Sequence, residues 1–328
     1  GELDLPRAIS DHNAPPSPVS CMRTLIDPRV SAQASAYAAQ FAAGDPFRHV
    51  QIDGFFANDY LQQLLAEFPA FERGNARNEA GELAGKSVVE RIRALGPAYA
   101  ALDTLIQSPE FLALVATLTG IPDLLYDPHY FGGGTHENRA GQDLDPHVDF
   151  NRHSITGWHR RLNLIVYLNP EWEDAWGGSL ELHSDPRRPD NRIRLITPLL
   201  NRAVIFETTE WSWHGFSRIA LPPERSGLSR RSIALYFYTR ERPTEELADP
   251  HSTIYVDRPL PAHLREGHTL SAEDMQTLRV LLARRDQHIQ RLYRDAQSRD
   301  ANLEQLRDLL RRSRLSRIAH WVRRLLGR

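Results

Sequence analysis

The chain is poor in cysteine and lysine, and it contains no long apolar run. Cys21 is the single cysteine among 328 residues, so no disulfide can form within the chain, which is typical of a reducing compartment. No run of about 18 apolar residues occurs, and the first residues lack the apolar core of a signal peptide. Only one of the 40 basic residues is a lysine, and the net charge of −2 gives no argument for nucleic-acid binding. These absences predict a cytoplasmic protein with no nucleic-acid partner.

His147 and Asp149 form an H-x-D motif, which brings together two side chains that bind metals. Successive side chains of a strand point to opposite faces, so His147 and Asp149 would face the same way. With His214 from a distant strand they would make the two-histidine, one-carboxylate set that suits non-haem Fe(II) and leaves positions open. Zinc accepts the same set, so these three residues alone leave the metal undecided.

The spacing of the motif is weak support without its context. With 14 histidines and 42 acidic residues in 328, chance gives about two H-x-[D/E] matches. The chain has two, and the second, His183 with Asp185, is followed by a loop rich in arginine and proline. Several strand-like runs separate the first motif from His214. The alternative is that His147, Asp149 and His214 are unrelated polar residues, but the surrounding strands favour a metal site.

Strand-like segments follow the first motif in a distinctive order. They are residues 160–169 (RRLNLIVYLN), a Trp-Gly-Gly turn at 176–178, residues 203–206, His214, and residues 230–237 (RRSIALYF). This order resembles the 2-oxoglutarate/Fe(II)-dependent oxygenase superfamily, specifically its prolyl-4-hydroxylase-like branch, over residues 45–240. The resemblance implies a double-stranded β-helix and an enzyme that hydroxylates an unactivated C–H bond with release of succinate and CO2. It implies Fe(II) and 2-oxoglutarate as cofactor and cosubstrate, with ascorbate as an optional addition.

A bidentate 2-oxoglutarate needs its distal carboxylate held, and the planar fork of arginine suits that task. We expect Arg230 to hold it, because strand alternation then places the small residues Ser232 and Ala234 on the same face. The R-x-S pattern of the family falls on the same residues, whereas Arg231 would bring larger apolar side chains. The gap between His214 and Arg230 is longer than is usual in the family, which leaves the choice between the two arginines open.

Three further residues are candidates for contact with 2-oxoglutarate. Tyr130 and Tyr167 match two tyrosines that contact the cosubstrate in the prolyl hydroxylases. Asn163 shares a strand face with Tyr167 and is expected to line the same pocket. The alternative for the tyrosines is that they are ordinary strand aromatics.

The fold class predicted is α+β and mainly β, because many short strands are separated by turn signals. A jelly-roll with N-terminal supporting helices, followed by a long C-terminal helix or coiled coil, accounts for this pattern. The domains expected along the chain are a disordered tail at 1–20, an oxygenase domain at 21–245 (helical support at 21–122, jelly-roll at 123–240), a linker at 246–270, a coiled-coil helix at 271–312 and a basic amphipathic segment at 313–328.

The segment 271–312 repeats apolar residues every three or four positions, which predicts a coiled coil that joins two chains in a homodimer. The alternative is a long helix folded back on the catalytic domain. The seam residues are Met275, Leu278, Leu282, Arg285, Ile289, Leu292, Ala296, Arg299, Leu303, Leu306 and Leu310.

The segment 313–328 has arginines on one side and apolar residues on the other, a pattern typical of a helix lying on anionic lipid. This predicts peripheral contact at the inner face of a membrane. The alternative is a solvated helix end.

Three functions fit these observations. The first is hydroxylation of a residue in a protein or peptide, of the prolyl type. The second is hydroxylation of a small molecule or sugar in a surface-polymer or natural-product pathway. The third is a non-catalytic metal-binding module, which the intact ligand set argues against.

Overall fold

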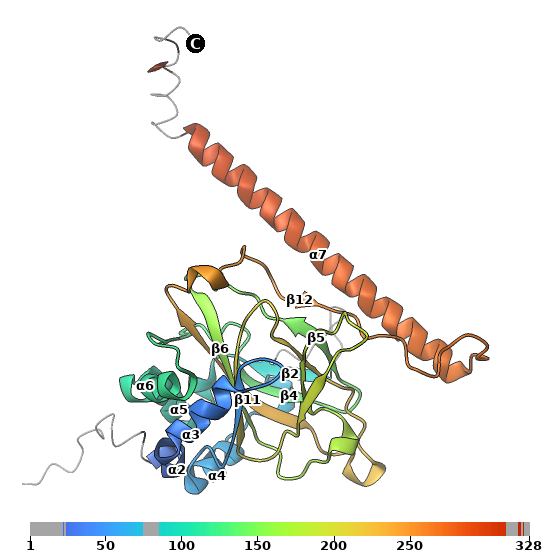
Figure 1. Ribbon diagram of the computed structural model, residues 1–328, viewed down its shortest axis with the longest axis horizontal. Helices are drawn as coiled ribbons and strands as arrows, with labels where there is room; N and C mark the ends of the chain where they lie inside the picture. Colours follow the sequence, from blue (N-terminus) through green and yellow to red (C-terminus); the bar gives the residue numbers. More distant parts are fainter. Residues whose placement is uncertain (1–21, 23, 75–84, 313–320, 323, 325–328) are drawn as a thin grey trace, which may run out of the picture. The chain divides into compact units, whose positions relative to one another are not determined.

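The computed structural model describes residues 22, 24–74, 85–312, 321–322 and 324, and it divides into two compact units (Figure 1). The first unit is Gly1–Val256 and the second is Asp257–Arg328. The expected tail at 1–20 lies outside the described residues, as does most of the basic segment 313–328. The predicted C-terminal long helix is confirmed: α7 runs over Ala272–Arg312 in the second unit.

The first unit is built on two antiparallel sheets. The larger, seven-stranded sheet has the order β1-β9-β6-β11-β4-β2, with β3 also paired to β11. The smaller, five-stranded sheet has the order β12-β5-β10-β7-β8. The strands are β1 His49–Asp53, β2 Lys86–Val89, β3 Leu125–Tyr126, β4 Gly134–Asn138, β5 Leu144–Val148, β6 His159–Tyr167, β7 Leu180–His183, β8 Ile193–Ile196, β9 Arg202–Glu207, β10 Trp213–Phe216, β11 Arg230–Thr239 and β12 Ile254–Tyr255.

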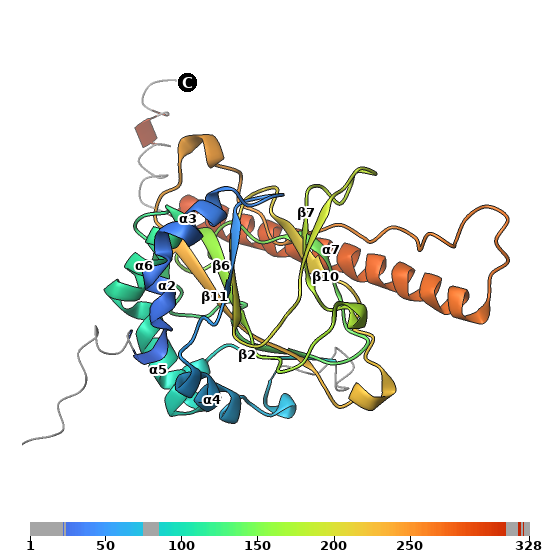
Figure 2. The ribbon, with the colours of Figure 1, turned by 60° about the horizontal axis from the view of Figure 1, so that its bottom comes forward.

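Five helices gather on one side of the larger sheet (Figure 2). Ser108 caps the last of them, because its hydroxyl accepts from the backbone N–H of Phe111, and Gly120 ends it in the left-handed conformation. The helices are α2 Pro28–Ala32, α3 Ala34–Ala42, α4 Asn58–Ala66, α5 Pro97–Gln107 and α6 Pro109–Thr119.

The side chains of β6 alternate between the apolar core and a cavity between the two sheets. Leu162, Leu164 and Val166 are fully buried among the residues of the supporting helices. Asn163 and Ile165 point to the opposite face, where they line a cavity between the sheets. The apolar face thus fixes the register of β6, and this register determines which side chains reach the cavity.

Three strands lie outside the segment 123–240 expected to form the jelly-roll. Strands β1 and β2 belong to the larger sheet and lie within 21–122, the segment expected to hold the supporting helices. Strand β12 lies in the expected linker 246–270 and forms the edge of the smaller sheet beside β5. All three strands obtain their backbone partners from residues far away in the chain, and local sequence does not report such partners.

No single helix of the described residues is long and apolar enough to cross a membrane. Helices α5 and α6 together reach that length and composition, but they meet at an angle of 65°. Their apolar faces are part of the core of the first unit.

Candidate metal centre

The two histidines of the predicted metal site lie opposite one another on neighbouring strands. His214 of β10 is the register partner of His147 of β5, and their ring centroids are 4.2 Å apart. Asp149 follows β5 directly, and its carboxylate oxygens lie 3.7 Å from Nε2 of His147 and 3.5 Å from Nε2 of His214. Strand pairing therefore brings together three side chains that are separated by up to 67 residues in the sequence.

The remaining ring nitrogens fix the tautomer of both histidines. Nδ1 of His147 lies 3.0 Å from the carbonyl of Asp145, and Nδ1 of His214 lies 2.9 Å from the carbonyl of Ser212. A carbonyl can only accept, so each Nδ1 carries the hydrogen and each Nε2 presents its lone pair to the centre of the trio. Burial, assisted by His147, lowers the pKa of His214 to about 3, so its ring is neutral, as a metal ligand must be.

The carboxylate of Asp149 is held from behind by Arg160 and Asn163. Nδ2 of Asn163 donates to Oδ2 of Asp149 at 2.8 Å, and the Arg160 guanidinium lies 3.3 Å from the same oxygen. Arg160 in turn donates twice to Oδ1 of Asn163. Burial works to raise the pKa of Asp149, but the charge of Arg160 and the interactions with His214 and His147 together outweigh it and hold that pKa well below its usual range. The carboxylate is therefore ionised and oriented before any ligand arrives.

Because Asn163 orients the carboxylate of Asp149, its replacement should weaken metal binding at the trio. Asn163→Leu removes the 2.8 Å bond to Asp149 and takes from the Arg160 guanidinium one of its acceptors, Oδ1 of Asn163. We expect Fe(II) affinity to fall about 10- to 100-fold, as for other partners of metal ligands. Titration of Fe(II) under anaerobic conditions measures this, and an affinity unchanged in the variant would refute the role of Asn163.

Arg230 points into the same cavity, which has a volume of about 270 Å³. Its Nε donates to the carbonyl of Gly178 at 2.6 Å, and an Nη donates to the hydroxyl of Tyr167 at 3.3 Å. Gly178, at a φ of +72°, brings its carbonyl to this position, and a Cβ there would stand 3.3 Å from Cδ of Arg230. Ser232 and Ala234 of β11 line the cavity beside Arg230, as expected from strand alternation.

Arg230 is a buried cation that no described carboxylate neutralises. It is 5% exposed, and burial lowers its pKa, with only the neutral Tyr167 working against that shift. Arg231 faces away from the cavity, where its half-exposed guanidinium pairs with Glu137 at 3.2 Å. The geometry thus points Arg230, and not Arg231, towards the metal trio, and it leaves the Arg230 fork available for an anion.

Tyr167 contacts Arg230, whereas Tyr130 lies in the helix-side core. Tyr167 is fully buried, and its hydroxyl accepts from Arg230. Tyr130 lies in the helix-side core, on the far side of the larger sheet from the cavity, and its hydroxyl donates to Asp103 of α5 at 3.0 Å. The expectation that Tyr130 contacts 2-oxoglutarate therefore conflicts with its position. Tyr130 has a φ of +51° in the turn before β4, so the alternation of strand side chains does not apply to it.

In this position Tyr130 contributes to the stability of the fold through its hydrogen bond to Asp103. Tyr130→Phe should cost about 0.5–1.5 kcal/mol in the free energy of unfolding, because it deletes one buried hydrogen bond to Asp103. The apparent KM for 2-oxoglutarate should stay at its original value. Denaturant unfolding and a KM measurement on the same variant check both parts, and a raised KM would restore Tyr130 to the cosubstrate site.

Two residues of the cavity wall were not anticipated from the sequence. Tyr255 of β12 places its ring 5.1 Å from that of His147 and lines the cavity. Lys86 of β2, the one lysine of the chain, also lines it. A strand of two residues and a lone lysine have no local motif, so the sequence held little signal for either.

The second H-x-D motif is not part of this centre. Nε2 of His183 lies 3.1 Å from Glu181, and its Nδ1 lies 2.9 Å from the amide of Asn191.

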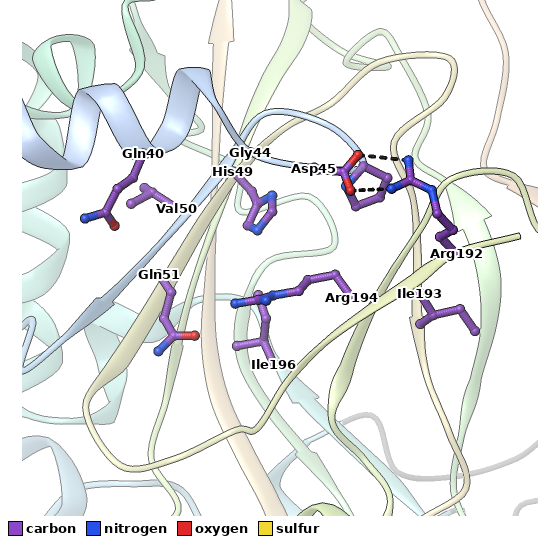
Figure 3. A pocket seen from close by; sticks show the side chains of 11 residues that line it. Gln40, Gly44, Asp45, His49, Val50, Gln51, Arg192, Ile193, Arg194 and Ile196 are labelled. Atoms are coloured by element: carbon purple, nitrogen blue, oxygen red, sulfur yellow. Dashed lines mark hydrogen bonds and ion pairs between the residues drawn. The ribbon is translucent and has the colours of Figure 1, made fainter.

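A second cavity, of about 470 Å³, opens between β1 and β8 (Figure 3). The bidentate ion pair between Arg192 and Asp45 lies in its wall, and none of the expected site residues lines it.

Comparison with known families agrees with this geometry. A family model described as the 2OG-Fe(II) oxygenase superfamily matches residues 133–238. That segment runs from the residue before β4 into β11, and it contains His147, Asp149, His214 and Arg230.

Two curated prolyl 3-hydroxylases, both named OGFOD1, are similar to part of the chain. The Xenopus laevis protein is 34% identical over 95 residues, which are 28% of this chain and 18% of that protein. The Mus musculus protein is 29% identical over 149 residues, which are 41% of this chain and 25% of that protein. The matched parts therefore span no more than a quarter of either relative.

Solved structures with a related fold include prolyl hydroxylases. One from Phytophthora capsici is 19% identical, with a TM-score of 0.45, over 78% of this chain and 74% of its own. One from Trichoplax adhaerens, in complex with a hypoxia inducible factor peptide fragment, is 14% identical, with a TM-score of 0.44, over 64% of this chain and 90% of its own.

Proposed function

Because a model of the 2OG-Fe(II) oxygenase superfamily matches residues 133–238, we propose that this protein is an Fe(II)- and 2-oxoglutarate-dependent dioxygenase. It hydroxylates an unactivated C–H bond and releases succinate and CO2. The observation that carries the proposal is one cavity that holds both a two-histidine, one-carboxylate trio and a buried arginine that pairs with no carboxylate in the described part of the chain. The first set suits iron, and the second suits the distal carboxylate of the cosubstrate.

Each cavity residue then has a separate task. His147, Asp149 and His214 would hold Fe(II), which supplies the oxygen-activating chemistry when bound. Asn163 and Arg160 keep the Asp149 carboxylate in place. Arg230, positioned by the carbonyl of Gly178 and the Tyr167 hydroxyl, would bind the far end of 2-oxoglutarate. The small side chains of Ser232 and Ala234 leave the cosubstrate room.

For the substrate, we propose a residue of a protein or peptide, of the prolyl type, because the curated relatives are prolyl 3-hydroxylases. A screen of succinate release with Fe(II), 2-oxoglutarate and ascorbate over prolyl peptides, sugars and small metabolites tests this. Turnover of a prolyl peptide supports the proposal, and turnover restricted to a sugar or small molecule would replace it with the second reading. An absence of 2-oxoglutarate turnover by protein that has bound Fe(II) would leave a metal-binding module.

We also propose that α7 pairs two chains through the seam predicted over 271–312. Leu292→Asp with Leu303→Asp places two charges in that seam, so the mass in light scattering should fall from a dimer to the 37.4 kDa of one chain. Gln290→Asp with Asn302→Asp adds the same charge outside the seam and should leave the dimer intact. A monomeric parent chain, or equal loss in both variants, would refute seam-mediated pairing.

A further inference from the structure

A second group of metal-binding side chains lies at the start of α7, within the second unit. Nε2 of His263 is 2.7 Å from Oδ1 of Asp274, and Nε2 of His268 is 2.8 Å from Oδ2 of the same carboxylate. One ligand atom of each of the three residues lies within 4.8 Å of the other two. The proposed iron site accounts for none of these residues.

The Asp274 carboxylate at the centre of this group is held in place by Ser271 as well as by the two imidazoles. Oδ2 of Asp274 accepts from the backbone N–H and the hydroxyl of Ser271, at 2.8 and 2.9 Å, while the backbone N–H of Asp274 donates to that hydroxyl. This is the reciprocal pattern of a capping box, and it confirms the helix start expected at Ser271. Oδ1, by contrast, has His263 as its side-chain partner and is turned away from the cap.

Residues 257–270 contribute no side chain to an apolar core. None of their side chains is buried, and Asp274 is the one buried residue of α7. Apart from this group, the ties between the segment and α7 include Asp257 with Arg285 and His288, at 2.9 and 3.1 Å. Pairs between exposed charges contribute about 0–1 kcal/mol each, too little to hold a segment of this length by themselves. Small segments without an apolar core are commonly stabilised by a structural metal.

We propose that His263, His268 and Asp274 form a binding site for a divalent transition metal of the Zn(II) class. Two imidazoles and one carboxylate are three of the four ligands of a tetrahedral zinc ion, and water would complete the set. The nitrogen–oxygen separations of 2.7 and 2.8 Å would open to roughly 3.3 Å around an ion with bonds of about 2.0 Å. Each neutral imidazole would move its hydrogen from Nε2 to Nδ1 and present the Nε2 lone pair, so metal binding requires no net loss of protons.

This site differs in character from the trio in the β-sandwich. The side chains of His263 and His268 are 58% and 31% exposed, against 7% for His147 and His214. An exposed site with one water ligand is suited to clamping residues 257–270 onto the first turn of α7. It stabilises the start of the helix and takes no part in the reaction.

The test uses the full chain carrying Asp149→Ala, so that the trio of the first unit no longer contributes a complete site. Calorimetric titration with Zn(II) should then show one ion per chain, and Co(II) should give the visible absorption of a tetrahedral site. His263→Gln with His268→Gln keeps an N–H donor for each oxygen of Asp274 but removes two of the three proposed metal ligands. That variant should lose at least about 100-fold in zinc affinity, and His129→Gln, an exposed histidine of the first unit, should lose none.

A complementary substitution separates metal binding from the hydrogen-bonded cap. His268→Cys removes the hydrogen bond to Asp274 and supplies a thiolate, which zinc accepts, so zinc binding should persist with a stronger charge-transfer band for Co(II). Unchanged helix content in the glutamine variant, measured by far-UV circular dichroism, shows that its loss of zinc is not loss of fold. Zinc retained by the glutamine variant, or no zinc bound by the Asp149→Ala chain, would overturn the proposal.

Discussion

Asp149→Ala should abolish 2-oxoglutarate turnover and lower Fe(II) affinity by more than about 100-fold. Replacing a neighbour of a metal ligand commonly costs 10- to 100-fold, so removing one of three ligands should cost more. The change also leaves the Arg160 guanidinium, which lies 3.3 Å from Asp149, as a buried cation beside two imidazoles, and this repels a metal ion. Anaerobic Fe(II) titration and succinate release measure the two effects.

The matched control is Asp185→Ala, because Asp185 belongs to the other H-x-D motif of the chain. Asp185 accepts from the backbone of Arg187 in an exposed loop and lines no part of the metal cavity. Its removal should leave iron binding and turnover as they were. Iron retained by Asp149→Ala but lost by Asp185→Ala would move the site to His183 and refute the assignment.

Arg230→Lys should raise the apparent KM for 2-oxoglutarate by about 10- to 100-fold. Lysine keeps the charge but loses the planar fork, and a hydrogen bond to a charged group is worth about 1.5–3 kcal/mol. Lysine also has no donor at the position of the arginine Nε, so the hydrogen bond to the carbonyl of Gly178 is lost. Steady-state kinetics with varied 2-oxoglutarate measures the change.

Arg231→Lys supplies the control at the next residue. Its guanidinium faces Glu137 on the other side of β11 and is 42% exposed, so the KM should change by less than about threefold. A larger effect at Arg231 than at Arg230 would mean that β11 is shifted by one residue, which would turn every side chain to the opposite face.

The part of the site that lies on regular strands could be predicted from the sequence. Alternation along β5, continued to the residue after it, puts His147 and Asp149 on one face, and the apolar residues of β11 favour Arg230 over Arg231 for the cavity. These inferences need only the two-residue period of a strand and a strand that buries one face. Periodicity therefore predicts which side chains share a face, whereas the family resemblance supplied the order of motifs that includes His214, the R-x-S pattern and the chemistry.

The remainder depends on contacts that no local pattern encodes. Tyr130 was expected at the cosubstrate from the family resemblance, but it lies in a turn with positive φ and its hydroxyl donates to Asp103. Tyr255 was missed because β12 has only two residues and exists through its pairing with His147 and Val148. Arg160 reaches Asp149 only because its guanidinium lies along β6, where it also donates to Asn163 three residues further on. Local sequence does not predict this side-chain direction.

The Arg230 guanidinium, which pairs with no carboxylate of the described residues, also links the stability of the fold to the proposed cosubstrate. Burying a cation without a counter-charge costs free energy, and the folded protein bears that cost while the cavity holds no anion. An anion that binds the native chain and not the unfolded one adds RT ln(1 + [L]/Kd) to the stability, about 2.7 kcal/mol at one hundred times Kd. The thermal resistance of this protein would therefore follow the supply of a central metabolite, and a cell short of 2-oxoglutarate would hold a less durable enzyme as well as a slower one.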